Sequence, residues 1–176
     1  MQLKLDDVPK LGLDLDYLQP VAELGLDELQ PRFAAAVQVH LRLLRIESTV
    51  NVQGVADTRA RLQCSRCLEG FELPLRVELT ADFNPEVVVP AAPGKELELS
   101  GEELDGYSYT DERLPIDDFV REQLILALPM VPICRADCRG LCAHCGANLN
   151  QGPCPCPPEA DALGPLGEQI LRLRKK

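Results

Sequence analysis

Six of the chain's eight cysteines lie within 23 residues, between Cys134 and Cys156. This segment reads CRADCRGLCAHCGANLNQGPCPC, and the other two cysteines, Cys64 and Cys67, lie upstream in the stretch CSRC. A C-x2-C turn directs two thiolates to the same side, at about the spacing of two corners of a zinc tetrahedron. Proline and glycine between the thiols leave little apolar chain to bury, so packing does not account for them. The spacing therefore predicts sites of four cysteine ligands.

Eight thiols suffice for two tetrahedral sites, and the sequence leaves their partition open. The preferred partition groups Cys142, Cys145, Cys154 and Cys156 in one site, and Cys64, Cys67, Cys134 and Cys138 in the other. In one alternative, the four thiols from Cys134 to Cys145 form one site and the two outer pairs form the other. In another, only one site exists and the remaining thiols are free. His144 lies inside a C-x2-C turn, where its ring is badly placed to be a ligand.

The residues around the thiols suit a structural zinc site. Asn148, Asn150 and Gly152 predict a turn that brings Cys154 and Cys156 back to the first pair. Arg66, Arg135 and Arg139 lie beside cysteines and could offset the negative charge of the thiolates. Four thiolates favour Zn2+ over hard cations, with iron as the alternative. A catalytic zinc keeps an open position for water, which four cysteines do not leave, so one or two structural zinc ions are expected and an enzyme is not.

The start of the chain bears on its compartment. The first residues, MQLKLDDVPK, lack the basic and apolar regions of a signal peptide. No apolar run approaches the ~20 residues that a membrane span requires. We expect a cytoplasmic protein, in which thiols stay reduced rather than forming disulfides.

Residues 33–83 show the period-two alternation of β-strands, most clearly between Phe71 and Phe83. This pattern predicts an antiparallel sheet of about four to six strands with one buried face, and CSRC at a hairpin connection. Gly54 predicts a bulge or turn within this region, and Pro74, on the outward face, predicts an edge position.

One helix is expected over residues 115–128, where apolar residues recur at helical spacing. Pro115 suits its first turn, and Asp117 and Asp118 complement the helix dipole there. Residues 84–112 predict a long acidic loop, because proline and glycine interrupt every periodic pattern.

The termini carry weaker patterns. A short strand is predicted from Leu11 to Leu15. A helix is predicted from Val21 to Gln30, although Gly25 weakens that prediction, and a short amphipathic helix is predicted over residues 159–173. The fold class is thus α+β: residues 1–130 form the sheet and its helix, residues 131–158 a cysteine-rich zinc module, and residues 159–176 a short basic tail.

Charge and aromatic content narrow the choice of partners. The net charge of −10 disfavours a basic surface for nucleic acid that extends over the whole chain. Aromatic residues are 4% and there is no tryptophan, which disfavours a platform on which bases stack. An acidic chain suits a basic partner such as a ribosomal protein. The local exception is a group of arginines expected on the solvated sheet face: Arg42, Arg45, Arg59 and Arg61. They are either a patch for RNA or an acidic partner, or a face whose charges pair with Glu72 and Glu78.

Three stretches together resemble the YceD family of large-subunit ribosomal RNA accumulation proteins: CSRCLEGFELPL, REQLILALP and CRGLCAHCGANLNQGPCPC. They span residues 64–156 with little interruption. The resemblance implies a role in large ribosomal subunit assembly, exerted on rRNA or a ribosomal protein without catalysis. Family members vary in how many of the C-terminal cysteines they keep.

The function expected from these observations is that of a non-enzymatic factor in large ribosomal subunit biogenesis, with structural zinc and neither a membrane nor a small-molecule substrate. One alternative is a zinc-ribbon protein that binds nucleic acid directly. The other is a thiol redox protein, although the βαβ context of a thioredoxin-like motif is missing.

Overall fold

The structure is a computed structural model that describes residues 3–26, 32–86 and 106–156. The chain divides into two compact units. The first unit contains Met1–Arg61 and Glu72–Leu128, and the second contains Leu62–Phe71 and Pro129–Lys176. The predicted helix over residues 159–173 and the basic tail lie outside the described residues.

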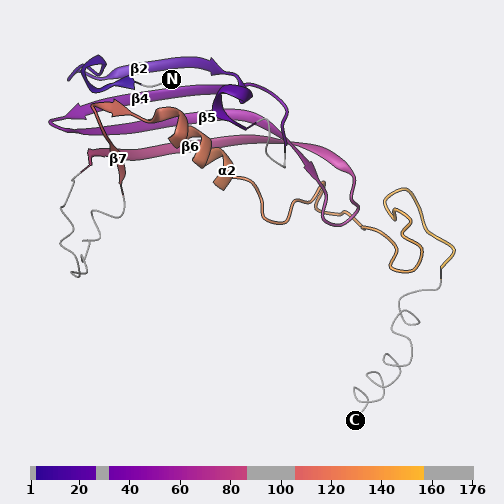
Figure 1. The fold of residues 1–176 in the computed structure, drawn as a ribbon. Coiled ribbons are helices and arrows are strands. Elements are labelled where there is room, and N and C mark those ends of the chain that lie inside the picture. Colours follow the sequence, from indigo (N-terminus) through magenta and orange to yellow (C-terminus); the bar gives the residue numbers. More distant parts are fainter. Residues whose placement is uncertain (1–2, 27–31, 87–105, 157–176) are drawn as a thin grey trace, which may run out of the picture. The chain divides into compact units, whose positions relative to one another are not determined.

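A six-stranded sheet forms the body of the first unit (Figure 1). Its path is β2 (Leu13–Gln19), β4 (Val37–Ile46), β5 (Thr49–Gln63), β6 (Gly70–Pro85) and β7 (Tyr107–Tyr109), and β3 (Arg32–Phe33) pairs with β5 beside this path. The β2–β4 and β4–β5 pairs are antiparallel, whereas β7 runs parallel to the end of β6. The predicted α+β fold is confirmed, and the parallel β6–β7 pair makes the sheet mixed.

Alternation places one face of each long strand in the core. In β4, Val37, Val39, Leu41 and Leu43 are at most 3% exposed, and in β6 the inward residues from Leu75 to Phe83 are buried. Pro74 points outward in β6, and β7 pairs only with Phe83–Pro85, so Pro74 has one described neighbouring strand, β5. This position agrees with the predicted edge.

The turn or bulge predicted at Gly54 is wrong. Strand β5 runs through Gly54, which pairs with Leu41 in an unbroken antiparallel register. A Cβ atom at Gly54 would overlap the main-chain carbonyl of His40. Glycine here permits two strands to approach closely and does not end one of them.

Helix α2 (Ile116–Leu126) lies across the sheet and buries Ile116, Phe119, Val120 and Leu124 (Figure 1). The ring of Phe119 packs edge-on against Phe83, with the ring centroids 5.6 Å apart. The predicted main helix is therefore confirmed, ending two residues earlier than the sequence pattern suggested.

The segments around the sheet differ more from expectation. Val21–Leu24 forms the 3-10 helix η2, which ends at Gly25 with φ of 61°, and residues 27–30 of the predicted helix lie outside the described residues. The 3-10 helix η1 spans Leu5–Asp7, and β1 (Leu3–Lys4) pairs with β8 (Arg113–Leu114). Strand β7 (Tyr107–Tyr109) falls in the stretch predicted to be an acidic loop, and β8 follows directly after that stretch, because strands this short leave no periodic signal. None of the described helices has the length and apolar character to span a membrane.

Candidate metal centre

The eight cysteines form two groups of four within the second unit. The local cluster consists of Cys142, Cys145, Cys154 and Cys156, and the long-range cluster consists of Cys64, Cys67, Cys134 and Cys138. In each group all four sulfur atoms lie within 4.8 Å of one another, and all eight thiols are free of disulfide bonds. The grouping is that of the preferred partition, and each cluster could hold a metal ion.

The turn in the long-range cluster is closed by two main-chain hydrogen bonds. Leu68 N–H donates to the carbonyl of Cys64 at 2.9 Å, and Cys64 N–H donates to the carbonyl of Glu69, also at 2.9 Å. Leu68 adopts a left-handed conformation with φ of 59°. The turn thereby aims both thiols of the CSRC stretch at one point.

The local cluster contains the same turn. Gly146 N–H donates to the carbonyl of Cys142 at 2.9 Å, and Cys142 N–H donates to the carbonyl of Ala147 at 2.8 Å. Gly146 has φ of 70°, in the place that Leu68 occupies in the other turn. The chain therefore uses one C-x2-C geometry twice, which the sequence hides because leucine replaces glycine in one copy.

The sulfur–sulfur distances of the long-range cluster fit a tetrahedral metal. Cys64 Sγ lies 3.8 Å from Cys138 Sγ, and Cys67 Sγ lies 3.7 Å from Cys134 Sγ. A tetrahedron with Zn–S bonds of about 2.3 Å has edges of about 3.8 Å, whereas a disulfide bond is about 2.05 Å long. The donor set and its spacing therefore fit a zinc ion.

Burial and main-chain donors shape the ionisation of the long-range cluster. Cys64, Cys67 and Cys138 are at most 4% exposed. Burial opposes ionisation of Cys64, but main-chain N–H groups, led by that of Cys134 with N–S 3.4 Å, lower the pKa of its thiol to about 6. Burial, followed by the neighbouring Cys64, raises the pKa of Cys134 to about 12. The cluster thus loses its first proton readily, and a bound metal would displace the others.

The local cluster is more accessible to solvent. Cys145 is exposed, and Cys142, Cys154 and Cys156 are partly exposed. The main-chain N–H groups of Cys145 and His144 lower the pKa of the Cys142 thiol to about 6. The neighbouring thiol of Cys145, together with burial, raises the pKa of Cys156 to about 12. His144 contributes its main chain, and its ring belongs to neither group of four.

The arginines expected to offset thiolate charge make other contacts. Arg66 Nη1 donates to the carbonyl of Cys138 at 3.1 Å, and Arg135 pairs with Asp137 at 3.5 Å. Arg139 donates its main-chain N–H to Asn150 Oδ1 at 2.8 Å. The sulfur atoms accept hydrogen bonds from main-chain N–H groups and from the side chain of Asn150, for which the sequence predicts only a place in a turn.

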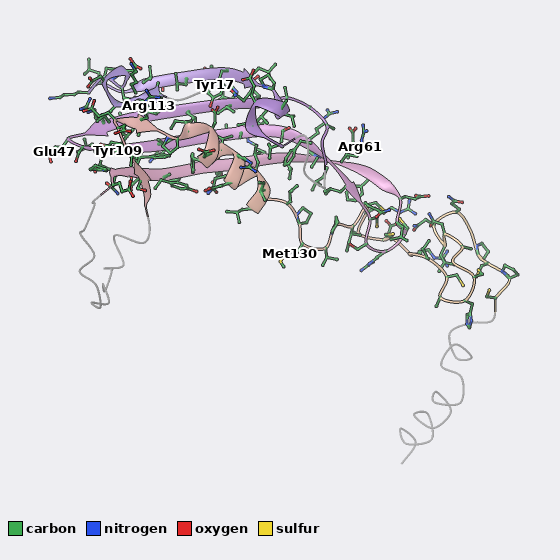
Figure 2. All side chains as sticks on the ribbon, viewed as in Figure 1. Tyr17, Glu47, Arg61, Tyr109, Arg113 and Met130 are labelled. Atoms are coloured by element: carbon green, nitrogen blue, oxygen red, sulfur yellow. The ribbon has the colours of Figure 1, made fainter. Side chains whose placement is uncertain are left out.

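The predicted arginine patch does not form as a unit. Arg42, Arg59 and Arg61 lie on the outward face, whereas Arg45 follows the parity of Leu43 and points to the opposite face. There Arg45 Nη1 donates to the carbonyl of Leu5 at 3.1 Å, and its Nε donates to that of Glu47. Figure 2 shows Glu47 and Arg61 at opposite ends of the sheet.

Carboxylates from neighbouring strands pair with the outward arginines. Arg61 lies 3.1 Å from Glu72, which also lies 4.0 Å from Arg59, and Arg42 lies 3.9 Å from Asp14. Two more cross-strand pairs, Arg76 with Asp57 and His40 with Asp16, occupy the same face. Much of the positive charge of this face is therefore balanced locally.

These features define a class: an α+β protein whose cysteine-rich unit carries two four-thiol clusters that could hold metal ions. The chain belongs to the YceD family, because residues 52–166 match the family described as "Large ribosomal RNA subunit accumulation protein YceD". The resemblance found in the sequence is thereby confirmed.

Proteins from a bacterium and two plants are similar to this chain. An uncharacterized protein of Mycobacterium bovis is 28% identical over 138 residues, which cover 78% of this chain and 63% of that protein. The "Large ribosomal RNA subunit accumulation protein YCED homolog 1, chloroplastic" of Arabidopsis thaliana is 28% identical over 163 residues, covering 80% of this chain and 50% of that protein. The protein of the same name from Zea mays is 25% identical, covering 78% and 54%. The chain thus spans about half to two thirds of these relatives, and no solved structure matches it.

Proposed function

We propose that this protein is a non-enzymatic factor in the accumulation of large-subunit ribosomal RNA, and that it acts by binding a large-subunit ribosomal protein or the rRNA itself. The observation that carries the proposal is a pair of closed four-thiol clusters in a chain of the YceD family. A reducing compartment such as the cytoplasm suits eight free thiols.

The clusters fit a structural role for zinc. Four cysteine sulfurs fill a tetrahedral coordination shell and leave no position for a catalytic water. Zinc bound there would contribute folding free energy to the second unit, which has few regular elements among its described residues. The Cys64–Cys67 turn and the Cys134–Cys138 segment would be held together by the metal.

The charge distribution favours a basic protein as the partner. The chain carries a net charge of −10, and the outward arginines lie beside Glu72 and Asp14. RNA binding would require that these arginines leave their carboxylate partners, whereas a basic ribosomal protein would be attracted by the net charge.

The test is a native pull-down of the tagged protein, divided into RNase-treated and untreated halves. Recovery of a large-subunit ribosomal protein from both halves is the expected result. Recovery only without RNase would assign binding to rRNA and support the zinc-ribbon alternative. Absence of ribosomal components from both halves would contradict the proposal. In the same pull-down, Arg42→Ala tests whether the outward face takes part in binding. Arg42 is chosen because its ion pair with Asp14 is long and exposed.

A thiol redox role is the second candidate, because the pKa values of Cys64 and Cys142 are lowered to about 6. It predicts protein that is isolated free of metal with reactive thiols. Two zinc ions per chain in freshly isolated protein would exclude it in favour of structural sites.

A further inference from the structure

The strip from Cys138 to Cys142 contributes one ligand to each cluster. Hydrogen bonds join each side of the strip to a different part of the chain. On one side it meets the turn of the long-range cluster: Leu141 N–H donates to the carbonyl of Arg66 at 3.1 Å, and Arg66 Nη1 donates to the carbonyl of Cys138 at 3.1 Å. Arg66 lies between the two cysteines of that turn. The strip is therefore fixed directly to the long-range cluster.

The other side of the strip meets the loop that the local cluster closes. Leu149 N–H donates to the carbonyl of Gly140 at 2.9 Å, and Leu141 forms a β-bridge with Asn148. Gly140 has φ of 75°, and a Cβ atom there would lie 3.1 Å from the carbonyl oxygen of Arg66. The absence of a side chain at Gly140 lets the strip lie close against Arg66.

Asn150 extends from this loop to a sulfur atom of the other cluster. Its Nδ2 donates to Cys138 Sγ at 3.4 Å and to Asn148 Oδ1 at 2.9 Å. Its Oδ1 accepts the main-chain N–H of Arg139 at 2.8 Å. Because that N–H requires an acceptor, the amide oxygen faces Arg139 and the amide nitrogen faces the sulfur.

We infer that Asn150 is a positioning residue that couples the two clusters. Metal in the local cluster fixes the loop between Cys145 and Cys154, and the fixed loop holds the Asn150 amide against Cys138 Sγ. The hydrogen bond stabilises the thiolate as a ligand, so the long-range cluster holds its metal more tightly when the local cluster is filled. The coupling is reciprocal, as linkage requires. The inference rests on the metal binding proposed above.

The expected change in metal affinity can be estimated from residues that hydrogen-bond to metal ligands in other proteins. Losing a hydrogen bond to a ligand typically lowers metal affinity about 10–100-fold. Asn150→Asp keeps the shape and the acceptor for Arg139 N–H, but it places a carboxylate against the thiolate. Asn150→Ser removes the amide without adding charge, and serves if the aspartate variant folds poorly.

Gln151→Ala is the matched control. Gln151 is adjacent to Asn150, and its Nε2 donates to Glu69 Oε1 at 3.1 Å beside the same turn, with no contact to sulfur. A change that merely loosens the loop would affect both variants alike. A change that acts through the Cys138 thiolate affects the Asn150 variants alone.

The experiment measures zinc release to excess EDTA, with the phase that Cys67→Ser abolishes assigned to the long-range cluster. We expect that phase to be about 10–100-fold faster in Asn150→Asp and Asn150→Ser, and unchanged in Gln151→Ala. Cys145→Ser, which opens the local cluster, is expected to accelerate the same phase, and combining it with Asn150→Asp should add little.

Three results would overturn or redirect the inference. If the accelerations from Cys145→Ser and Asn150→Asp multiply, Asn150 acts independently of the local cluster and does not couple the two clusters. The coupling is equally wrong if Cys145→Ser leaves the long-range phase unchanged. If the unaltered protein binds no zinc at all, the proposed metal sites fail, which is a separate outcome.

Discussion

The two clusters have identical ligands but join very different parts of the chain. The local cluster spans 15 residues, from Cys142 to Cys156. In the long-range cluster, Cys67 and Cys134 are separated by roughly 70 residues, so a metal there closes a loop that contains β6 and α2. Three thiols of the long-range cluster are buried, whereas every thiol of the local cluster retains some exposure.

This difference shows that the chemistry of the ligands alone does not determine how much a metal site contributes to the stability of the fold. A long loop raises the entropy cost of bringing the ligands together, and the metal offsets that cost. Buried thiolates without a metal are also expensive to keep charged, whereas exposed ones are stabilised by water. We therefore expect the long-range cluster to contribute more to the stability of the second unit than the local cluster, which orders one loop.

The largest effect is expected from Cys67→Ser. This substitution should remove the long-range metal and destabilise the second unit by more than about 4 kcal/mol, because loss of a structural metal is among the most damaging changes. Zinc content should fall by one ion per chain, and hydrogen exchange at the amides of Cys64 and Leu68 should become fast. Ser65→Ala is the control, since the bond of Ser65 to Pro132 uses only its main-chain N–H.

A smaller effect is expected from Cys145→Ser in the exposed cluster. The variant should lose one zinc ion and the faster phase of zinc release to EDTA, while the amides of Cys64 and Leu68 stay protected. Quantified zinc and hydrogen exchange on the same sample provide the measurement. Equal loss of protection in the Cys67 and Cys145 variants would show that the two clusters fold as one unit and do not differ in what they stabilise.

Alkylation of the metal-free protein distinguishes how thiol ionisation and solvent exposure each affect cysteine reactivity. The thiols of Cys64 and Cys142 both have a pKa of about 6, lowered from 9.0, so both are thiolates at pH 7. Only Cys142 is accessible, and it should react with iodoacetamide much faster than the fully buried Cys64. Mass mapping of the labelled cysteines checks the order, and similar rates would mean that the long-range cluster opens without metal.

The same pKa values set a pH window for the metal-free fold. Because the pKa values of these two thiols are lowered on folding, their contribution to stability is complete above about pH 9 and is lost as the pH falls through 6. The raised pKa values of Cys134 and Cys156 act in the opposite direction above pH 9. Labelling of Cys142 should therefore slow about tenfold for each pH unit below 6, as its thiolate is protonated. A flat pH profile between 5 and 7 would contradict the lowered pKa.

The smallest effect concerns the residue after each C-x2-C turn. Gly146→Ala should cost about 1 kcal/mol, since nothing lies within 4 Å of the added methyl group and the cost comes only from the left-handed backbone. Leu68→Gly should change stability by less than about 0.5 kcal/mol, because relief of strain and the greater flexibility of the unfolded chain oppose each other. Thermal unfolding of the two variants, with zinc at saturation, compares the turns directly.

The alternation of residues predicted the sheet well, because a strand with one buried face shows its period directly. The same rule would have placed Arg45 correctly: it is two residues from Leu43 and so shares the buried parity, but Leu44 interrupts the alternation and obscures the count. Gly54 was misread because glycine suits both a turn and a close approach of two strands, and only the pairing with Leu41 decides between them.

The thiol groups could be predicted only in part. A C-x2-C spacing shows which two thiols act together, but not which pair joins which, since that depends on contacts between distant segments. The bond from Leu141 to Arg66 is such a contact, and no periodic pattern announces it. Likewise the amide of Asn150 meets Cys138 only because the loop turns back at Asn148, so its role could not be read from its position in the sequence.

The long span of the long-range cluster has a consequence for synthesis of the chain. Translation proceeds at roughly 5–20 residues per second, so several seconds pass between the appearance of Cys67 and that of Cys138. During that interval the nascent chain offers a finished two-thiol turn before the cluster's other two ligands have both been made. The supply of free zinc and the redox state around the translating ribosome therefore act on the first two thiols before the second unit is complete.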